Sequence, residues 1–381
     1  MKSKTSLTLI LFIVWIGSFA QSDQKYAAGV QQYIDSFQRT RQFPGMTVSF
    51  IVSGTQTSLA TGWSDLEEKK LITPTDRMLA GSTGKTFFAT LAMQMIKEGK
   101  IDLDAHVSKY LGKKNWYHRL ANHETITVRM LMNHTTGIEE YYDLGDFMDQ
   151  LRMKPFKTWK HEELISFVLD RRPLFPAGSQ FNYADTNYLL LGLIMEELTG
   201  KDLYELIRKN ILSPLSLNQT SPSTSRKIKG LIPGYVGDRS VFRIAGKTID
   251  NGKFVINPQF EWAGGGFVST SKDLAIWAKQ YYCGNVNPKI DTAAMHEGVK
   301  ANTGRDHLYG LGIQIRPSGD GKGYGHGGWF PGYLTEMEYF PEIDIAIAIQ
   351  FNTDDFNKLG KHPRSVLLEI LQVIAKAKQE K

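Results

Sequence analysis

The chain has 381 residues, of which 41% are hydrophobic and 22% charged, and its formal net charge at pH 7 is +6. This length and composition suffice for one large domain or two modest ones with an ample core. The positive excess is small and includes no basic block, so it does not point to a nucleic-acid partner. Cys283 is the only cysteine, which excludes an internal disulfide and a thiolate metal site.

Residues 1–20 have the pattern of a secretory signal peptide. Lys2 and Lys4 give a positive start, a short apolar run follows, and Ser18-Phe19-Ala20 is a small-x-small cleavage site. The apolar run is too short to span a bilayer, and no later run reaches about 18 apolar residues. We therefore expect cleavage after Ala20, export to the periplasm or the medium, and no membrane span in the mature chain.

The first elements of the mature chain should be a helix and a β-hairpin. Apolar and aromatic residues recur at helical spacing over residues 24–42. Two strand-like segments, 46–52 and 57–63, flank Ser53-Gly54-Thr55, which is typical of a hairpin turn.

Ser82 precedes a strongly apolar helix. Residues 86–98 are mostly helix formers, are apolar on nearly every face, and end at Gly99. Ser82 should lie at or just before the N-terminus of this helix, with Lys85 three residues on along the same face. Because the helix dipole and a dry setting both favour loss of the lysine's proton, the pattern predicts a nucleophile with a base beside it.

Two other interpretations of this stretch are possible. Gly84-Lys85-Thr86 matches the end of a phosphate-binding loop, but Leu79 stands where that loop needs a glycine. A plain helix cap with a solvated lysine is the simpler alternative, since Ser-x-x-Lys is a short pattern. The hypothesis of a nucleophile therefore needs partners elsewhere in the chain.

The remaining pattern predicts an α/β (α+β) fold. The expected helices are 128–133, 161–170, 187–198, 202–210, 272–282 and 365–378, and the expected later strands are 241–245, 253–256, 311–315, 333–340 and 343–351. Strands near both termini with helices between them indicate an antiparallel sheet formed from both chain ends and flanked by helices. A mostly helical subdomain, roughly residues 85–225, should be inserted in it.

Tyr183 lies in the connection before an apolar helix, where a phenol can face a cleft. One or two nearby ammonium groups would lower its pKa and make it a phenolate base. A tyrosine simply packed at the start of a helix is the commoner alternative.

A glycine-rich segment, residues 325–332, comes just before a predicted strand. Gly327 and Gly328 would let a substrate backbone approach the strand edge and would leave N–H groups free for an oxyanion hole. His326 would add a hydrogen bond or a positive charge there. A glycine-rich turn without function explains the composition equally well.

Taken in order, Ser82-x-x-Lys85, Tyr183-x-Asp185 and His326-Gly327-Gly328 resemble the motifs of the serine β-lactamase and penicillin-recognising DD-peptidase superfamily. The chain is most similar to the class C-like branch, which includes D-alanyl-D-alanine carboxypeptidases, D-aminopeptidases and related esterases. Segments 131–137 and 187–192 also resemble that branch, and the similarity covers nearly all of residues 21–381.

The resemblance implies an exported serine hydrolase that forms an acyl-Ser82 intermediate on a small amide or ester, with a D-residue-containing peptide as the favoured substrate. Lys85 would activate Ser82 directly or by holding Tyr183 as a phenolate, and Tyr183 would pass the proton to the leaving group. The backbone N–H groups of Ser82 and Trp329 would form the oxyanion hole. Substrate binding would fall to Asp185, His326, Gly327 and Gly328. No cofactor or metal is expected, and the sequence leaves the oligomeric state open.

Two departures from the superfamily pattern set further expectations. Asp185 replaces an asparagine and His326 a lysine; an aspartate cannot donate to a carbonyl, and histidine is only partly charged at neutral pH. We expect weak β-lactam hydrolysis, a Lys85 ammonium fixed by Asp185, Tyr183 as the working base, and a preference for substrates with an amine. The alternatives are a carboxylesterase, a weak β-lactamase, or a non-catalytic penicillin-binding-like sensor.

Overall fold

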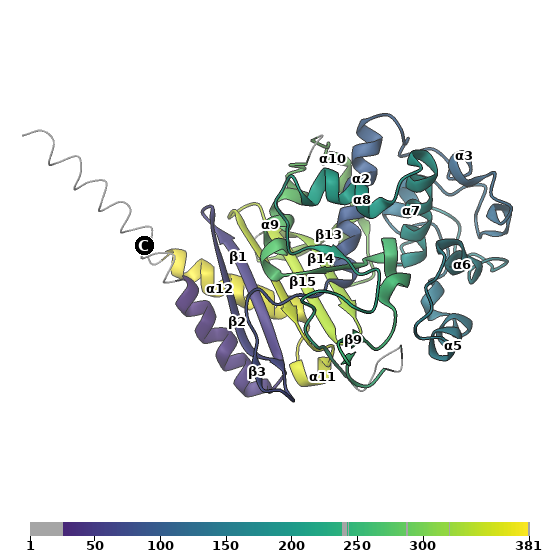
Figure 1. The fold of residues 1–381 in the computed structure, drawn as a ribbon. Coiled ribbons are helices and arrows are strands. Elements are labelled where there is room, and N and C mark those ends of the chain that lie inside the picture. The colour runs from purple at the N-terminus through teal and green to yellow at the C-terminus, as the bar shows by residue number, and fades with distance from the viewer. Residues whose placement is uncertain (1–25, 238–241, 243, 287–288, 320, 380–381) are drawn as a thin grey trace, which may run out of the picture.

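An antiparallel sheet organises the structure, a computed structural model that describes residues 26–237, 242, 244–286, 289–319 and 321–379. Within these residues the sheet has nine strands in the order β11-β12-β13-β14-β15-β16-β1-β2-β3. The strands are β1 (Gly45–Val52), β2 (Thr55–Asp65), β3 (Lys70–Leu71), β11 (Val299–Lys300), β12 (Leu308–Tyr309), β13 (Gln314–Ser318), β14 (Gly321–Phe330), β15 (Tyr333–Phe340) and β16 (Ile345–Phe351). β1 pairs with both β2 and β16, so the two chain ends meet inside one sheet (Figure 1).

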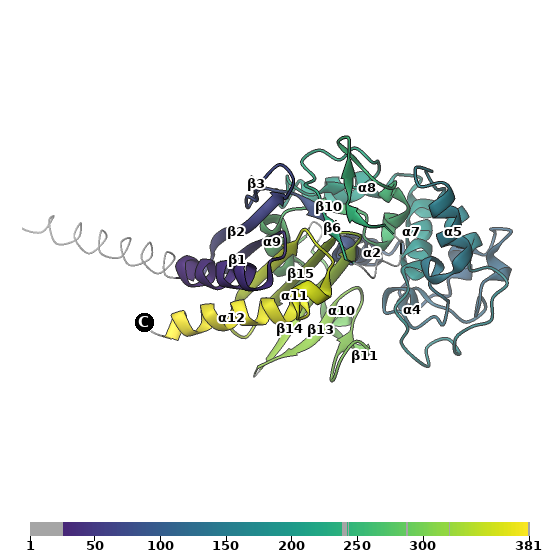
Figure 2. The ribbon, with the colours of Figure 1, turned by 90° about the horizontal axis from the view of Figure 1, so that it is seen from below.

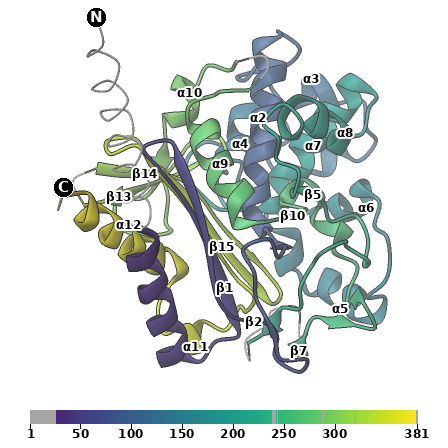
Figure 3. The same cartoon turned by 60° about the vertical axis from the view of Figure 1, so that its left-hand side comes forward.

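Two helices from opposite ends of the chain cover one face of the sheet. They are the helix at residues 26–41 and α12 (Pro363–Gln379), which lie side by side in Figures 2 and 3. Alternation along β16 explains the packing, because Ile345, Ile347 and Ile349 join the cluster beneath these helices. The alanines between them, Ala346 and Ala348, face the other side, where α9 (Ser271–Tyr282) packs closely.

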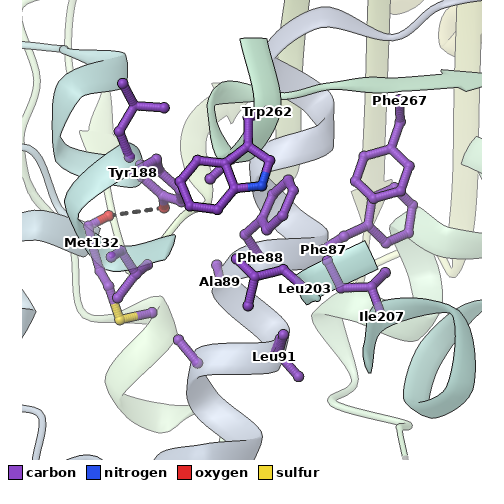
Figure 4. Packing of buried hydrophobic residues seen from close by; sticks show 14 of the residues in the cluster. Phe87, Phe88, Ala89, Leu91, Met132, Tyr188, Leu203, Ile207, Trp262 and Phe267 are labelled. Atoms are coloured by element: carbon purple, nitrogen blue, oxygen red, sulfur yellow. Dashed lines mark hydrogen bonds between the residues drawn. The ribbon is translucent and has the colours of Figure 1, made fainter. Parts of the chain in front are cut away.

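The other part of the molecule is mainly helical and is built around α2 (Lys85–Lys97). Phe87 and Phe88 of α2 pack against Phe267, with ring centroids 4.9 and 5.6 Å away, and Trp262 lies nearby (Figure 4). The remaining helices of this part are α3 (Ser108–Leu111), α4 (Val128–Met132), α5 (Gly145–Met153), α6 (His161–Ser166), α7 (Asp185–Thr199) and α8 (Leu203–Ile207), with α8 continued by a π-helical turn, η4 (Arg208–Leu212). α2 is therefore buried between the sheet and the helices.

Short elements connect the two parts. They are the 3-10 turns η1 (Gly81–Gly84), η2 (Tyr117–Arg119), η3 (Tyr141–Asp143) and η5 (Pro258–Gly264); the strands β4 (Met78–Leu79), β5 (Ser221–Pro222), β6 (Tyr235–Val236), β7 (Gly246–Lys247), β8 (Ile249–Asp250), β9 (Lys253–Phe254) and β10 (Phe267–Ser269); and the helices α10 (Ala293–His296) and α11 (Phe356–Leu359). β10, which follows η5, pairs with β4, which precedes η1, so the turns η1 and η5 lie close together. β10 also pairs with β5.

The predicted fold class is confirmed, and most of the predicted elements are present. The helix predicted at 161–170 stops at Ser166, and Asp170 adopts φ 61°, outside the helical region. The strand predicted at 253–256 shrinks to β9, and that at 311–315 begins only at Gln314. The strand predicted at 241–245 lies partly outside the described residues, and the predicted signal peptide lies entirely outside them. The subdomain boundaries at about 85 and 225 stay a prediction.

Among the helices that the structure describes, none is both long and apolar enough to cross a bilayer.

Candidate active site

Ser82 lies in η1, the single turn that leads into α2. Gly81 has φ 54°, and a Cβ there would lie 2.6 Å from the backbone N of Trp329, so only glycine lets this turn approach β14. Gly84 has the same role on the other side, since its Cβ would lie 2.2 Å from the carbonyl oxygen of Gly265. Two glycines thus seat Ser82 between the sheet edge and the turn after η5.

Lys85, the first residue of α2, is fully buried beside Ser82. Its Nζ lies 3.0 Å from Ser82 Oγ and also donates to the carbonyl oxygen of Gly264. An ion pair joins it to Asp185, the first residue of α7. The predicted Ser–Lys pair is therefore present, and Asp185 compensates the charge of the ammonium.

Tyr183 is brought to the same place, but not as the predicted phenolate. Burial raises the pKa of Tyr183 well above its usual value, and the Asp185 carboxylate raises it further, while Ser82 acts in the opposite direction. Among the described residues its hydroxyl group makes no well-formed hydrogen bond, although the Ser82 hydroxyl lies close enough to lower its pKa. Lys85 Nζ lies 4.9 Å from the centroid of the ring. The expectation of a lowered pKa is wrong, because burial raises the pKa of Tyr183 and the nearby carboxylates, led by Asp185, add to this effect.

His326 is also buried, and it is not the partly charged group that we expected. Burial and the nearby Lys85 lower its pKa to about 3, so the imidazole is neutral at physiological pH. Its Nε2 lies 2.8 Å from the hydroxyl oxygen of Tyr309, and its Nδ1 lies 2.6 Å from the carbonyl oxygen of Gly327. His326 thus supplies hydrogen bonds and no positive charge.

The edge of β14 next to η1 carries two backbone N–H groups of interest, those of Gly327 and Trp329. β13 pairs with β14 only as far as Gly325, which leaves the following residues without a strand partner on that side. The N–H of Gly327 donates to Oε1 of Gln314 at 3.0 Å, so Gln314 occupies a position that we expected a substrate backbone to take. The N and O atoms of Trp329 both lie against Gly81. The Trp329 N–H therefore lies beside the turn that carries Ser82, and its role in an oxyanion hole stays a prediction.

A cavity of about 600 Å³ joins these groups. The predicted residues that line it are Ser82, Tyr183, Asp185, His326, Gly327, Gly328 and Trp329. Lys85 is buried next to Ser82 and does not line the cavity, whereas its partners Ser82 and Asp185 do. Aromatic side chains, including Tyr142, Phe242 and Phe260, form much of the remaining wall.

Several residues of the site were missed by sequence reasoning. They are His134, Glu140, Glu261, Tyr309 and Gln314. His134 stacks on Tyr183 with ring centroids 4.2 Å apart and belongs to segment 131–137, which had resembled the superfamily. Glu261 directly precedes Trp262-Ala263-Gly264-Gly265-Gly266, and an acidic residue next to such a glycine run was a usable signal. Nothing in the pattern pointed to Tyr309 or Gln314.

The fold and the site define the class of protein as a serine hydrolase, with Ser82 as its candidate nucleophile and Lys85, one helical turn away, as the candidate activating group. Residues 30–372 match the model of the Beta-lactamase family, and the chain belongs to this family.

The chain also resembles individual known proteins in sequence and in fold. The D-aminopeptidase of Brucella anthropi is 22% identical over 294 residues, which are 77% of this chain and 53% of that protein. The chain spans about half the length of the curated relatives that it matches. Among solved structures, a D-stereospecific amidohydrolase from Streptomyces sp. has 26% identity and a TM-score of 0.74, covering 87% of this chain and 96% of that one. The D-amino acid amidase from Ochrobactrum anthropi shares the fold, with 20% identity, a TM-score of 0.78, and coverage of 93% and 99%.

Proposed function

We propose that the protein is an exported hydrolase that cleaves amides of D-amino acids, or short peptides containing them, through an acyl-Ser82 intermediate. The observation that carries the proposal is the contact of 3.0 Å between Lys85 Nζ and Ser82 Oγ at the wall of the cavity. The pattern of residues 1–20 supports export. The names of the amidohydrolase, amidase and aminopeptidase relatives support the substrate class.

The contacts of Lys85 suggest how Ser82 is activated. Burial raises the pKa of Asp185, although Lys85 opposes this, so the proton of the Lys85–Asp185 pair can reside on the carboxylate. As Ser82 Oγ attacks the carbonyl carbon of the substrate, its proton passes to Lys85 Nζ, while the Lys85 ammonium passes one of its own protons to the Asp185 carboxylate. The N–H groups of Ser82 and Trp329 stabilise the negative oxygen that forms.

Tyr183 has the opposite task. Because its raised pKa keeps the phenol protonated, it donates a proton to the leaving nitrogen when the tetrahedral intermediate collapses. The proton that the Lys85–Asp185 pair took up from Ser82 then returns to Tyr183. Water then hydrolyses the Ser82 ester by the same steps in reverse, which frees the acid and regenerates the enzyme.

The test combines covalent labelling with a substrate panel. The purified mature protein is incubated with a fluorophosphonate probe, D- and L-amino-acid amides, p-nitrophenyl esters and β-lactams, and adducts are detected by intact-mass measurement. We expect labelling that is absent in Ser82→Ala, release of ammonia from D-amides, and a loss of several orders of magnitude in acylation in Lys85→Arg, because a guanidinium does not lose its proton.

The other outcomes are equally clear. Turnover of esters without amides would make the protein a carboxylesterase, and rapid turnover of β-lactams would make it a β-lactamase. No labelling at any pH would contradict an enzymatic role and would favour a binding or sensor protein.

A further inference from the structure

We propose that Glu261 binds the free α-ammonium group of the substrate, so that the enzyme selects amino-acid amides and peptides with an unblocked amine over their N-acylated forms. This inference rests on the proposed function, since it assigns a partner to the group next to the scissile carbonyl.

Three carboxylates are buried around Lys85, those of Glu140, Asp185 and Glu261. Glu140 is satisfied, since one oxygen accepts from the N–H of Asp185 and the other from the N–H of Tyr142 at 3.3 Å. Asp185 is paired with Lys85. Glu261 is only 4% exposed, yet in the described part of the chain its Oε2 has no hydrogen-bond partner. Of the three, it is the carboxylate whose binding capacity is unused.

Glu261 also lies in the right place. It lines the same cavity as Ser82, whereas Glu140 does not. A Cβ at Gly265 would lie 2.8 Å from Glu261 Oε1 and 2.4 Å from the carbonyl oxygen of Gly81, so this carboxylate is next to the turn that carries the nucleophile. In an α-amino-acid amide only one carbon separates the ammonium from the carbonyl that Ser82 attacks. A group held near Ser82 can therefore reach Glu261.

The backbone is strained where it presents this side chain. Trp262 has φ 36° and ψ −118°, a conformation that a bulky residue rarely adopts. Its indole is held by His161, whose ring stacks on it with centroids 3.4 Å apart, and it is enclosed in the core (Figure 4). The same turn directs the carbonyl of Gly264 to Lys85 and Glu261 to the cavity. Strain retained at such a place is typical of a functional site.

The surroundings of Glu261 favour a cationic ligand over a metal ion. The charged and titratable groups that act on it, or on which it acts, are Lys85 of α2, Asp185 of α7, Tyr183 before α7, Tyr141 of η3 and Tyr204 of α8. Lys85, the cation among them, is already paired with Asp185. No group of three or more His, Cys, Asp or Glu among the described residues is arranged to hold a metal. An ammonium group would supply the missing positive charge and the missing hydrogen bonds.

Binding should also release a proton. Burial raises the pKa of Glu261 well above its usual value, Asp185 raises it further and Lys85 lowers it, so the empty cavity favours the protonated side chain. An ammonium beside it favours the carboxylate, and the proton then leaves to solvent. Affinity for an amine should consequently rise with pH, up to the pH at which the amine itself loses its charge.

The experiment measures selectivity in Glu261→Gln, which keeps the shape and removes the charge. The kcat/KM for D-alanine p-nitroanilide is divided by that for its N-acetyl form, a ratio that cancels any defect common to both substrates. We expect this ratio to fall by about 10²-fold, mainly through KM for the free amine, as for other buried charge pairs that lose one partner. Glu205→Gln, the same change at an exposed position outside the cavity, should leave the ratio unchanged.

Two results would overturn the assignment. An unchanged ratio in an active Glu261→Gln enzyme would overturn the role assigned to Glu261 and would leave the proposed function intact. Hydrolysis of p-nitrophenyl esters but of neither anilide by the wild-type enzyme would overturn both. If Glu261→Gln does not fold, calorimetric titration of the wild-type protein with D-alaninol in two buffers of different ionisation enthalpy replaces it. Proton release on binding is expected, and binding without proton release would contradict the proposal.

Discussion

The hydroxyl oxygen of Tyr309 lies 2.8 Å from Nε2 of His326, and this contact belongs to a chain of hydrogen bonds whose proton positions can be assigned. The N–H of Ala184 can only donate, so Nδ1 of His134, at 3.2 Å, is an acceptor and the proton of His134 is on Nε2. Nε2 of His134 lies 3.3 Å from the Tyr309 oxygen. Tyr309 accepts there and donates to His326, whose Nδ1–H then donates to the carbonyl of Gly327.

This chain makes both histidines neutral hydrogen-bonding residues. Burial lowers the pKa of His134 well below its usual value, as it does for His326. Tyr309, on the sheet, thereby connects the loop of His134, in the helical part, to the strand edge beside Ser82. We interpret Tyr309 and His326 as positioning residues that fix the Gly327 peptide group.

The first prediction concerns the pH dependence of stability. The pKa of His326 is about 3 in the folded protein and about 6.5 in an unfolded chain. Between these values only the unfolded state binds the proton, so the free energy of unfolding falls as pH decreases, by up to about 1.4 kcal/mol per pH unit. His326→Gln lacks this contribution and should lose less stability than the wild type between pH 6.5 and 4.5 in urea denaturation. Parallel curves for the two proteins would contradict a neutral buried His326.

The second prediction separates catalysis from packing at Tyr183. Tyr183→Phe removes a buried hydroxyl group that makes no well-formed hydrogen bond among the described residues, so the melting temperature should change little. Turnover of amides should fall by about 10²–10⁴-fold, since the leaving nitrogen loses its proton donor. Calorimetry and steady-state kinetics on the same preparation test both statements. Unchanged turnover would return Tyr183 to a purely structural role.

Local pattern was enough to predict the sheet and the positions of Ser82, Lys85 and Tyr183. The alternation in β16 and the glycine-bounded apolar run of α2 are local features, and the ordered motifs are short segments that the fold brings together. The corrections at Tyr183 and His326 have a common cause. A pKa depends on everything packed around the group, and Glu140, Glu261 and Tyr309 come from distant parts of the chain.

The occupied edge of β14 could not be predicted for the same reason. Glycines at 327 and 328 indicate a backbone that another group can approach closely, but they do not indicate which group does so. Gln314 reaches Gly327 only because β13 and β14 are paired in a register that places Gln314 opposite Gly325. Register between strands is fixed by the whole sheet and not by either segment alone.

The third prediction concerns a buried ionic cluster beneath the same strands. Arg316 is 5% exposed and donates to Glu338 at 2.7 Å and to Glu336 at 3.0 Å, both of them buried. Arg316→Ala would leave Glu336 without its arginine partner and Glu338 with Arg364 alone, and should lower the free energy of unfolding by about 3–5 kcal/mol. Arg119, which pairs with Asp170 on the surface, is the matched control. Chemical denaturation should show no measurable change for Arg119→Ala, and a similarly small effect in Arg316→Ala would be inconsistent with this account.

The last prediction concerns Asp185, where this chain departs from the asparagine of its superfamily. Its carboxylate is the ionic partner of Lys85 and lines the cavity beside Ser82. In Asp185→Asn the buried ammonium loses its counter-charge, so the neutral amine that accepts the Ser82 proton forms at lower pH. The acidic limb of the pH profile of kcat/KM should therefore move to lower pH. The new amide can donate to a substrate carbonyl, so acylation by β-lactams should become faster. Hydrolysis of D-amino-acid amides should slow, because a carboxylate is no longer present to take up the Lys85 proton. Stopped-flow acylation and steady-state kinetics across pH 5–9 measure both effects, and identical profiles for the two proteins would show that the Asp185 carboxylate has no part in the chemistry.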